Sequence, residues 1–180
     1  MSSRAAWRLE SFGFSQVFDY TAGKLDWLAN GFPRAGKRAA LPRAADVVRL
    51  DIPQCRLTDR LEDVREKVQA AGQNACVVVN DAGIVLGFLG REALKGIPVA
   101  SVAGAMDPGP TTIRPHMMLT EVPKYLHKQA MDRILVTTAE GRFVGILYRQ
   151  DAEQILDEEK SRQLDDDRAF SFLLQQDRRW

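Results

Sequence analysis

Apolar and polar positions follow each other in a fixed order along the middle of the chain. A short apolar segment, Cys55–Leu57, predicts a strand, and the apolar positions behind Asp59 then have helical spacing. These positions are Leu61, Val64, Val68 and Ala71. Glu62 lies three residues after Asp59, as in a capping box, so we expect a helix of about 13 residues.

Two further apolar runs flank a turn. Cys76–Val79 and Ile84–Leu89 are separated by Asn80–Gly83, a polar turn that ends in glycine. Apolar runs around such a turn predict an antiparallel hairpin. The pattern therefore predicts a strand, a helix and a hairpin in succession.

The same order recurs 58 residues later. Arg56–Leu94 matches Arg114–Ala152 without a gap, and a closing helix is predicted for Gln150–Glu159. The coinciding pairs include Arg56/Arg114, Leu61/Leu119, Val64/Val122, Gly83/Gly141, Gly87/Gly145, Leu89/Leu147 and Arg91/Arg149. Two copies are too few for a solenoid. We expect an α+β fold in which two β-α-β-β-α units pack about a pseudo-twofold axis and bury their sheets against each other.

The second copy carries the strongest resemblance to a known family. Gly141–Asp151 reads as glycine, apolar strand, Gly-Ile-Leu and a helix-starting aspartate, and Val102–Pro115 is similar to the linker of that family. Together with the repeat, the stretch from about Asp46 to Asp157 resembles a tandem pair of CBS domains, known as a Bateman module. The resemblance implies a non-enzymatic regulatory module whose clefts bind AMP, ADP, ATP or S-adenosylmethionine.

The resemblance also implies where such a ligand would bind. The family places Ser/Thr-x-x-Asp at the start of the closing helix, where the carboxylate accepts hydrogen bonds from a ribose. The second copy keeps Asp151 but has Tyr148 at the hydroxyl position, whereas the first copy has Gly90 and Ala93. We therefore expect an adenine nucleotide in the second cleft and poor or no nucleotide binding in the first.

Further candidates follow for the second cleft. Thr112 and Ile113 would contact the adenine, and Arg114, Arg133 or Arg149 would contact phosphate. Structural alternatives stay open, because Asp151 in a first helical turn is also a capping residue and the arginines could be solvated or paired. Tyr148 could stack on a base or simply fill the cleft.

The N-terminal segment carries a second resemblance. Ser3–Tyr20 and Gly23–Pro33 are similar to the last helix, strand and helix of a rhodanese domain. In that family a cysteine loop immediately precedes the helix that here begins at Ser3, so the catalytic cysteine is missing. We interpret residues 1–33 as a structural remnant whose apolar side chains need cover from the repeats or from a partner chain. These side chains are Trp7, Phe12, Phe14, Val17, Trp27 and Leu28.

Composition narrows the function classes. The 25 basic and 24 acidic residues nearly cancel, so net charge favours neither nucleic acid nor an anionic membrane as a partner. Because the chain has no long apolar segment and no apolar core of a secretory signal, we expect a cytoplasmic protein.

The residues that could bind metal or phosphate do not form a site in the sequence. Cys55 and Cys76 lack the spacing of a metal site or a disulfide framework, and Cys76 is expected to be an inert buried thiol. His116 and His127 have no ligand partners at metal spacing, and Gly31–Arg38 lacks the Ser or Thr of a phosphate loop.

These observations divide the chain into a remnant (1–33), a linker (34–45), two repeats (46–100 and 101–157) and a charged C-terminal helix or tail (158–180). The apolar run Phe170–Leu174 in the tail either packs on its own domain or docks on a second protomer. Because CBS pairs often self-associate, the resemblance favours a homodimer, and any signal would pass to a separate effector protein. The alternative is a structural or interaction protein that kept the fold after losing its ligand groups. Residual sulfur transfer ranks third because its nucleophile is missing.

Overall fold

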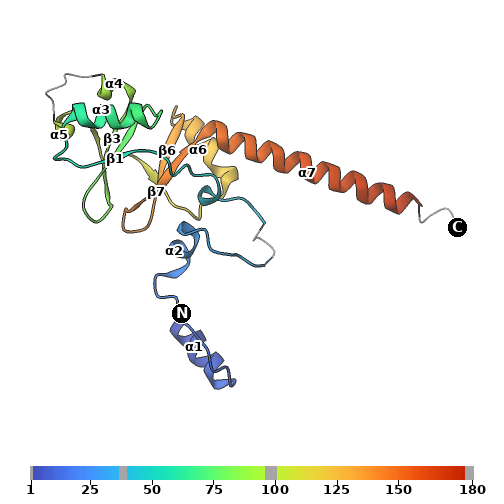
Figure 1. Cartoon of the computed structure of the whole chain (residues 1–180). Coiled ribbons are helices and arrows are strands. Elements are labelled where there is room, and N and C mark those ends of the chain that lie inside the picture. The colour runs from blue at the N-terminus through green and yellow to red at the C-terminus, as the bar shows by residue number, and fades with distance from the viewer. Residues whose placement is uncertain (1, 37–39, 96–100, 177–180) are drawn as a thin grey trace.

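Two small sheets, one from each copy of the repeat, form the centre of the molecule (Figure 1). The structure is a computed structural model that describes residues 2–36, 40–95 and 101–176. The first copy contains β1 (Gln54–Cys55), α3 (Leu61–Ala70), β2 (Cys76–Val79), β3 (Val85–Leu89) and α4 (Arg91–Leu94). The second contains β5 (Thr112–Ile113), the 3-10 helix η2 (Leu119–Glu121), α6 (Val122–Lys128), β6 (Arg133–Thr137), β7 (Phe143–Tyr148) and α7 (Arg149–Gln176). The predicted fold class is confirmed.

The strand pairing repeats residue for residue. Cys55 pairs with Val78 across parallel strands, and 58 residues later Ile113 pairs with Val136. Both hairpins are antiparallel and shift register at the equivalent step, between Val78 and Val79 and between Val136 and Thr137. The duplication therefore fixes the register as well as the order of the elements.

Two predicted bounds differ from the structure. β1 begins one residue earlier than the expected strand, and α3 has 10 residues, fewer than the expected helix. The helix ends early because Gly72 follows it with a φ of 63°. This left-handed conformation suits glycine and terminates a helix.

The repeat extends further toward the N-terminus than the apolar pattern indicated. The 3-10 helix η1 (Ala44–Asp46) and α5 (Val102–Ala105) occupy equivalent places in the two copies. After each of them the chain pairs with a hairpin strand: β4 (Asp107–Pro108) pairs with β3, and Arg49 pairs with Ile146 in β7. Each leading segment packs on the opposite copy, because Val102 lies in the first core and Ala44 in the second. Ala44, which we placed in the linker, is fully buried.

The two hairpin turns meet at the pseudo-twofold axis. The Val85 N–H donates to the Gly141 carbonyl at 3.0 Å, and the equivalent Phe143 N–H donates to the Gly83 carbonyl at 2.9 Å. Between them Ile84 pairs with Arg142, its own equivalent in the repeat. The expected pseudo-twofold arrangement is thus visible at the level of single hydrogen bonds.

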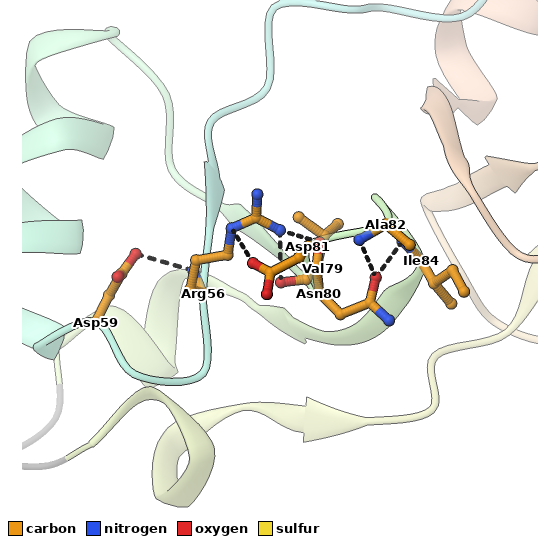
Figure 2. A network of polar contacts seen from close by, with 7 residues as sticks. All are labelled: Arg56, Asp59, Val79, Asn80, Asp81, Ala82 and Ile84. Carbon is orange, nitrogen blue, oxygen red and sulfur yellow. Dashed lines mark hydrogen bonds and ion pairs between the residues drawn. The ribbon is translucent and has the colours of Figure 1, made fainter.

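In each copy an arginine side chain donates hydrogen bonds to carbonyl groups of the hairpin turn. The Arg56 guanidinium donates to the carbonyls of Val79 and Asn80, while its backbone N–H donates to the Asp59 carboxylate at 2.8 Å (Figure 2). Within the turn, Oδ1 of Asn80 accepts from the N–H groups of Ala82 and Ile84 (Figure 2). The equivalent Arg114 donates to the carbonyls of Thr137 and Thr138. The coincidence of Arg56 and Arg114 in the repeat therefore has a structural cause.

Three apolar clusters hold the two copies together. One lies under the helices of each copy, and the third joins the facing sheets through Ile52, Val77, Val79, Leu135 and Ile146. Cys55 and Cys76 both lie in the first core. A hydrogen bond with Cys55 and burial both raise the pKa of the Cys76 thiol, which keeps it protonated.

The N-terminal segment leaves much of its apolar surface uncovered. The helices α1 (Ser2–Ser11) and α2 (Gly23–Ala29) lie apart from the sheets, and α7 continues well beyond the second sheet (Figure 1). Residues 12–22 form no strand, so the α-β-α order expected for residues 1–33 is wrong. Trp27 packs edge to face with Tyr20 and Phe32, but Trp7 and Phe18 are 64% and 89% exposed.

The closing helix expected at residues 150–159 is the first part of α7. No described helix is apolar enough over a sufficient length to cross a membrane.

Ala130→Gly is expected to stabilise the fold by about 1 kcal/mol. Ala130 has a φ of 53° where the equivalent Gly72 has 63°, so its Cβ is strained in a left-handed conformation. Urea denaturation would measure the shift. The matched control Ala70→Gly, in the ordinary helical backbone of α3, should destabilise by about 0.5–1 kcal/mol. Destabilisation by both substitutions would contradict the account of Ala130.

Candidate functional site

The pseudo-twofold axis relates two clefts between the copies that differ in their side chains. The first cleft is a hollow lined by Phe88, Asp107 and Arg133, and Gly90 borders it. We call the equivalent region at the start of α7, which carries Tyr148 and Asp151, the second cleft. A symmetric backbone therefore carries two chemically different sites.

Asp151 in the second cleft is held by an arginine that the sequence analysis did not select. Nε and Nη2 of Arg49 donate to Oδ2 and Oδ1 of Asp151, both at 2.7 Å. The same guanidinium lies 4.9 Å from the ring centroid of Tyr148. The hydrogen bond to Asp151 raises the pKa of Arg49, so the guanidinium stays charged at neutral pH. The carboxylate, the guanidinium and the aromatic ring form one cluster at the cleft.

The backbone around Arg49 fixes this cluster in place. The Arg49 N–H donates to the Ile146 carbonyl at 2.8 Å, and the Ile146 N–H donates to the Arg49 carbonyl at 3.0 Å. Gly145 permits this close approach, because a Cβ there would lie 2.8 Å from Cβ of Val48. The side chain of Asp151 is 22% exposed and that of Arg49 is 53% exposed. The pair thus lies at the mouth of the cleft, within reach of a ligand.

Sequence reasoning missed Arg49 although the repeat contained a signal. Extending the 58-residue offset backward places Arg49 on Asp107, just as Asp151 falls on Ala93. Arg49 and Asp151 in one cleft therefore correspond to Asp107 and Ala93 in the other. Because the charge differs between the copies at both positions, the comparison of the copies marks these two positions together.

Three of the predicted site residues lie elsewhere. Thr112, Ile113 and Arg114 line a hollow together with Met117 and Tyr125, and Asp151 is not among its lining residues. Ile113 is buried in the second core, and the Arg114 guanidinium is committed to the hairpin turn. The structure therefore does not bring these three residues together with Asp151.

The other two arginines also have partners away from Asp151. The Arg133 guanidinium lies 5.2 Å from the ring centroid of Phe88, and both residues line a hollow of about 300 Å³ in the first cleft. Arg149 lies 3.9 Å from the Glu153 carboxylate on the next turn of α7. Tyr148 is thus the only predicted candidate that shares a described contact partner, Arg49, with Asp151.

The first cleft carries a glycine where the second carries a tyrosine. A Cβ on Gly90 would lie 3.6 Å from Phe88 and 3.9 Å from Arg133, whereas the equivalent Tyr148 packs against the apolar cluster that joins the two sheets. Asp107 lines the first hollow in place of Arg49. The described residues contain no group of three or more histidine, cysteine or acidic side chains arranged to hold a metal ion.

Comparison with known proteins identifies the second copy. The family model of the CBS domain matches residues 99–158. The chain contains a CBS domain. No curated protein matches the chain. The rhodanese-like origin of residues 1–33 stays a prediction.

Solved structures of CBS pairs share the fold. The cytosolic domain of the Mg²⁺ channel MgtE in complex with ATP aligns with a TM-score of 0.59 and 22% identity, over 65% of this chain and 50% of that one. CBSX2, a CBS-pair protein of Arabidopsis thaliana, in complex with AMP aligns with 0.57 and 19%, over 64% and 96% of the two chains. The CBS domain pair of MJ0100 with 5′-methylthioadenosine and S-adenosyl-L-methionine aligns with 0.58 and 12%, over 66% and 98%. The chain thus spans half the length of the MgtE domain and nearly all of the two CBS pairs.

Proposed function

We propose that the chain is a non-catalytic regulatory module that binds an adenosine-containing ligand of the AMP, ADP or ATP class in the second cleft. The observation that carries the proposal is the Asp151 carboxylate in the first turn of α7, beside the ring of Tyr148. A carboxylate accepts two hydrogen bonds from a vicinal diol, and an aromatic face suits a purine.

The structural neighbours support this ligand class. CBS pairs with the same fold have been solved with ATP, with AMP and with S-adenosyl-L-methionine. Each of these three ligands contains an adenosine moiety, which is the part of the ligand that Asp151 and Tyr148 would contact. CBS domains are regulatory modules, which is consistent with a role as a sensor.

On this proposal, ligand binding makes Asp151 exchange partners. A ribose would take the lone pairs that now accept from Arg49, so its hydrogen bonds to Asp151 are partly offset by the loss of this two-point ion pair. Asp151 lies at the start of the 28-residue helix α7, so the exchange acts directly on that helix. A shift between two arrangements of α7 would then be read by a separate effector protein.

Calorimetric titration with AMP, ADP, ATP, NAD and S-adenosylmethionine tests the proposal. We expect saturable binding of at least one nucleotide of the AMP, ADP or ATP class to the wild-type chain. No binding of any of these ligands would overturn the proposal and favour the alternative, an interaction protein that has lost its ligand.

Exposed aromatic side chains favour a homodimer in either case. Trp7, Phe12, Phe14 and Phe18 are each more than 60% exposed, which is costly for a protein that stays alone. Sedimentation velocity at micromolar concentration is expected to show a dimer of the wild-type chain and a shift toward monomer for Trp7→Ser combined with Phe18→Ser. The control Leu50→Ser removes a side chain that is 70% exposed near the repeats and should leave the dimer unchanged. A wild-type monomer would contradict the prediction.

A further inference from the structure

Arg49 and Asp151 satisfy each other's charge in the second cleft. Both carboxylate oxygens accept from the guanidinium, in the two-point geometry that makes arginine–carboxylate pairs strong and specific. A ribose that takes the same lone pairs of Asp151 therefore displaces Arg49. The guanidinium of Arg49 would then lack its anionic partner.

Arg49 remains at the mouth of the cleft after such a displacement. Its backbone is held on β7 by two hydrogen bonds to Ile146, and its guanidinium lies over the ring of Tyr148. Asp51, whose charge also acts on Arg49, accepts a hydrogen bond from Gln73 at 2.9 Å. A guanidinium fixed in this way is positioned to bind a phosphate next to the ribose.

The other arginines considered for phosphate binding make their contacts outside the second cleft. Arg114 donates to the carbonyls of the hairpin turn, and Arg133 lies in the first cleft. Arg149 lies beside Glu153 on the surface of α7. Arg49 is thus the arginine whose contacts with Asp151 and Tyr148 place it at the second cleft.

We propose that Arg49 determines the specificity of the second cleft by exchanging Asp151 for a ligand phosphate, so that the site selects adenosine nucleotides over uncharged adenosine. This inference rests on the proposed function and names the ligand class of that same site. A nucleotide replaces both partners of the broken ion pair, because its ribose binds Asp151 and its phosphate binds Arg49. Adenosine replaces only one and leaves the guanidinium without an anion.

The first cleft provides the contrast. There Asp107 occupies the position of Arg49 and Ala93 that of Asp151, so a phosphate would meet a carboxylate in place of a guanidinium. The same backbone therefore favours phosphate in one cleft and disfavours it in the other. The selection depends on a side chain and not on the fold.

Titration of AMP and adenosine into the wild-type chain and Arg49→Gln tests the inference. The wild type should bind AMP at least about 10-fold more tightly than adenosine, the effect of one charge-assisted hydrogen bond. Arg49→Gln should weaken AMP by about 10-fold and strengthen adenosine by up to about 5-fold, because Asp151 is then free. Arg49→Lys keeps the charge and should retain part of the preference for AMP.

Arg60→Gln is the matched control. Arg60 is 71% exposed and lies 3.8 Å from Glu62, away from the cleft, so both affinities should stay unchanged. Circular dichroism would confirm that each variant is folded. Equal changes for AMP and adenosine in Arg49→Gln, or no change in either, would overturn the inference while the proposed function stands. Failure of adenosine, AMP, ADP and ATP all to bind the wild type would overturn the proposed function and the inference with it.

Discussion

Gly145→Ala is expected to destabilise the fold by about 2–3 kcal/mol, the upper range for overpacking a dense core. The new Cβ would lie 2.8 Å from Cβ of Val48 and 2.9 Å from the Arg49 carbonyl oxygen. Neither atom is the end of a flexible side chain, because this segment is hydrogen-bonded to β7. The segment that holds Arg49 over the cleft would have to move away from the sheet. Urea denaturation followed by circular dichroism would measure the loss.

Gly87→Ala provides the matched comparison. Gly87 is the equivalent glycine in β3, and the two atoms nearest to its Cβ belong to the thioether side chain of Met106, which can rotate away. The third is the Asp107 carbonyl oxygen at 3.1 Å, which is slightly farther away than the Arg49 carbonyl oxygen is from Gly145. The expected cost is about 1 kcal/mol, at the low end for overpacking. An equal or larger loss for Gly87→Ala would show that the leading segment before Arg49 is not held as rigidly as described.

Asp151→Asn is expected to weaken AMP binding by 10-fold or more. Asparagine keeps the size of the side chain and its ability to cap a helix, but removes the charge that strengthens hydrogen bonds from a ribose. Hydrogen bonds to charged groups contribute about 1.5–3 kcal/mol, which corresponds to this change in affinity. Calorimetry on the wild type and the variant would measure it.

Gly90→Tyr is the control for the other cleft. It places the tyrosine of the second cleft in the first, where Gly90 borders the hollow beside Phe88 and Arg133. AMP binding should be unchanged. Loss of binding in Gly90→Tyr with retention in Asp151→Asn would move the ligand to the first cleft.

The fold was predictable because the duplication constrains it at many positions. The 58-residue offset predicted both hairpins, and it holds in the structure down to the register shift at Val78 and at Val136. The leading segments were harder to predict, since Ala44 and Val102 pack on the opposite copy and local periodicity contains no sign of that exchange. The N-terminal strand was wrong for a different reason, because it rested on the resemblance to a rhodanese domain. Residues 12–22 form no strand, and Phe18 among them is 89% exposed.

The candidate site was predictable only in part. The resemblance selected Asp151 and Tyr148, which the structure brings together through Arg49. Arg49 itself is 102 residues from Asp151 in a segment without regular structure, so the only signal for it was the comparison of the two copies at the 58-residue offset. Arg114 illustrates the opposite case, because the repeat preserved it for the hairpin turn and its charge suggested a ligand.

The most direct test of the proposed site is hydrogen–deuterium exchange of the wild-type chain with and without saturating AMP. The account predicts slower exchange in two stretches, residues 44–52 around Arg49 and residues 143–152 at the end of β7 and the start of α7. Protection confined to residues 88–95 and 107–111 of the first cleft, or no protection at any AMP concentration, would contradict it.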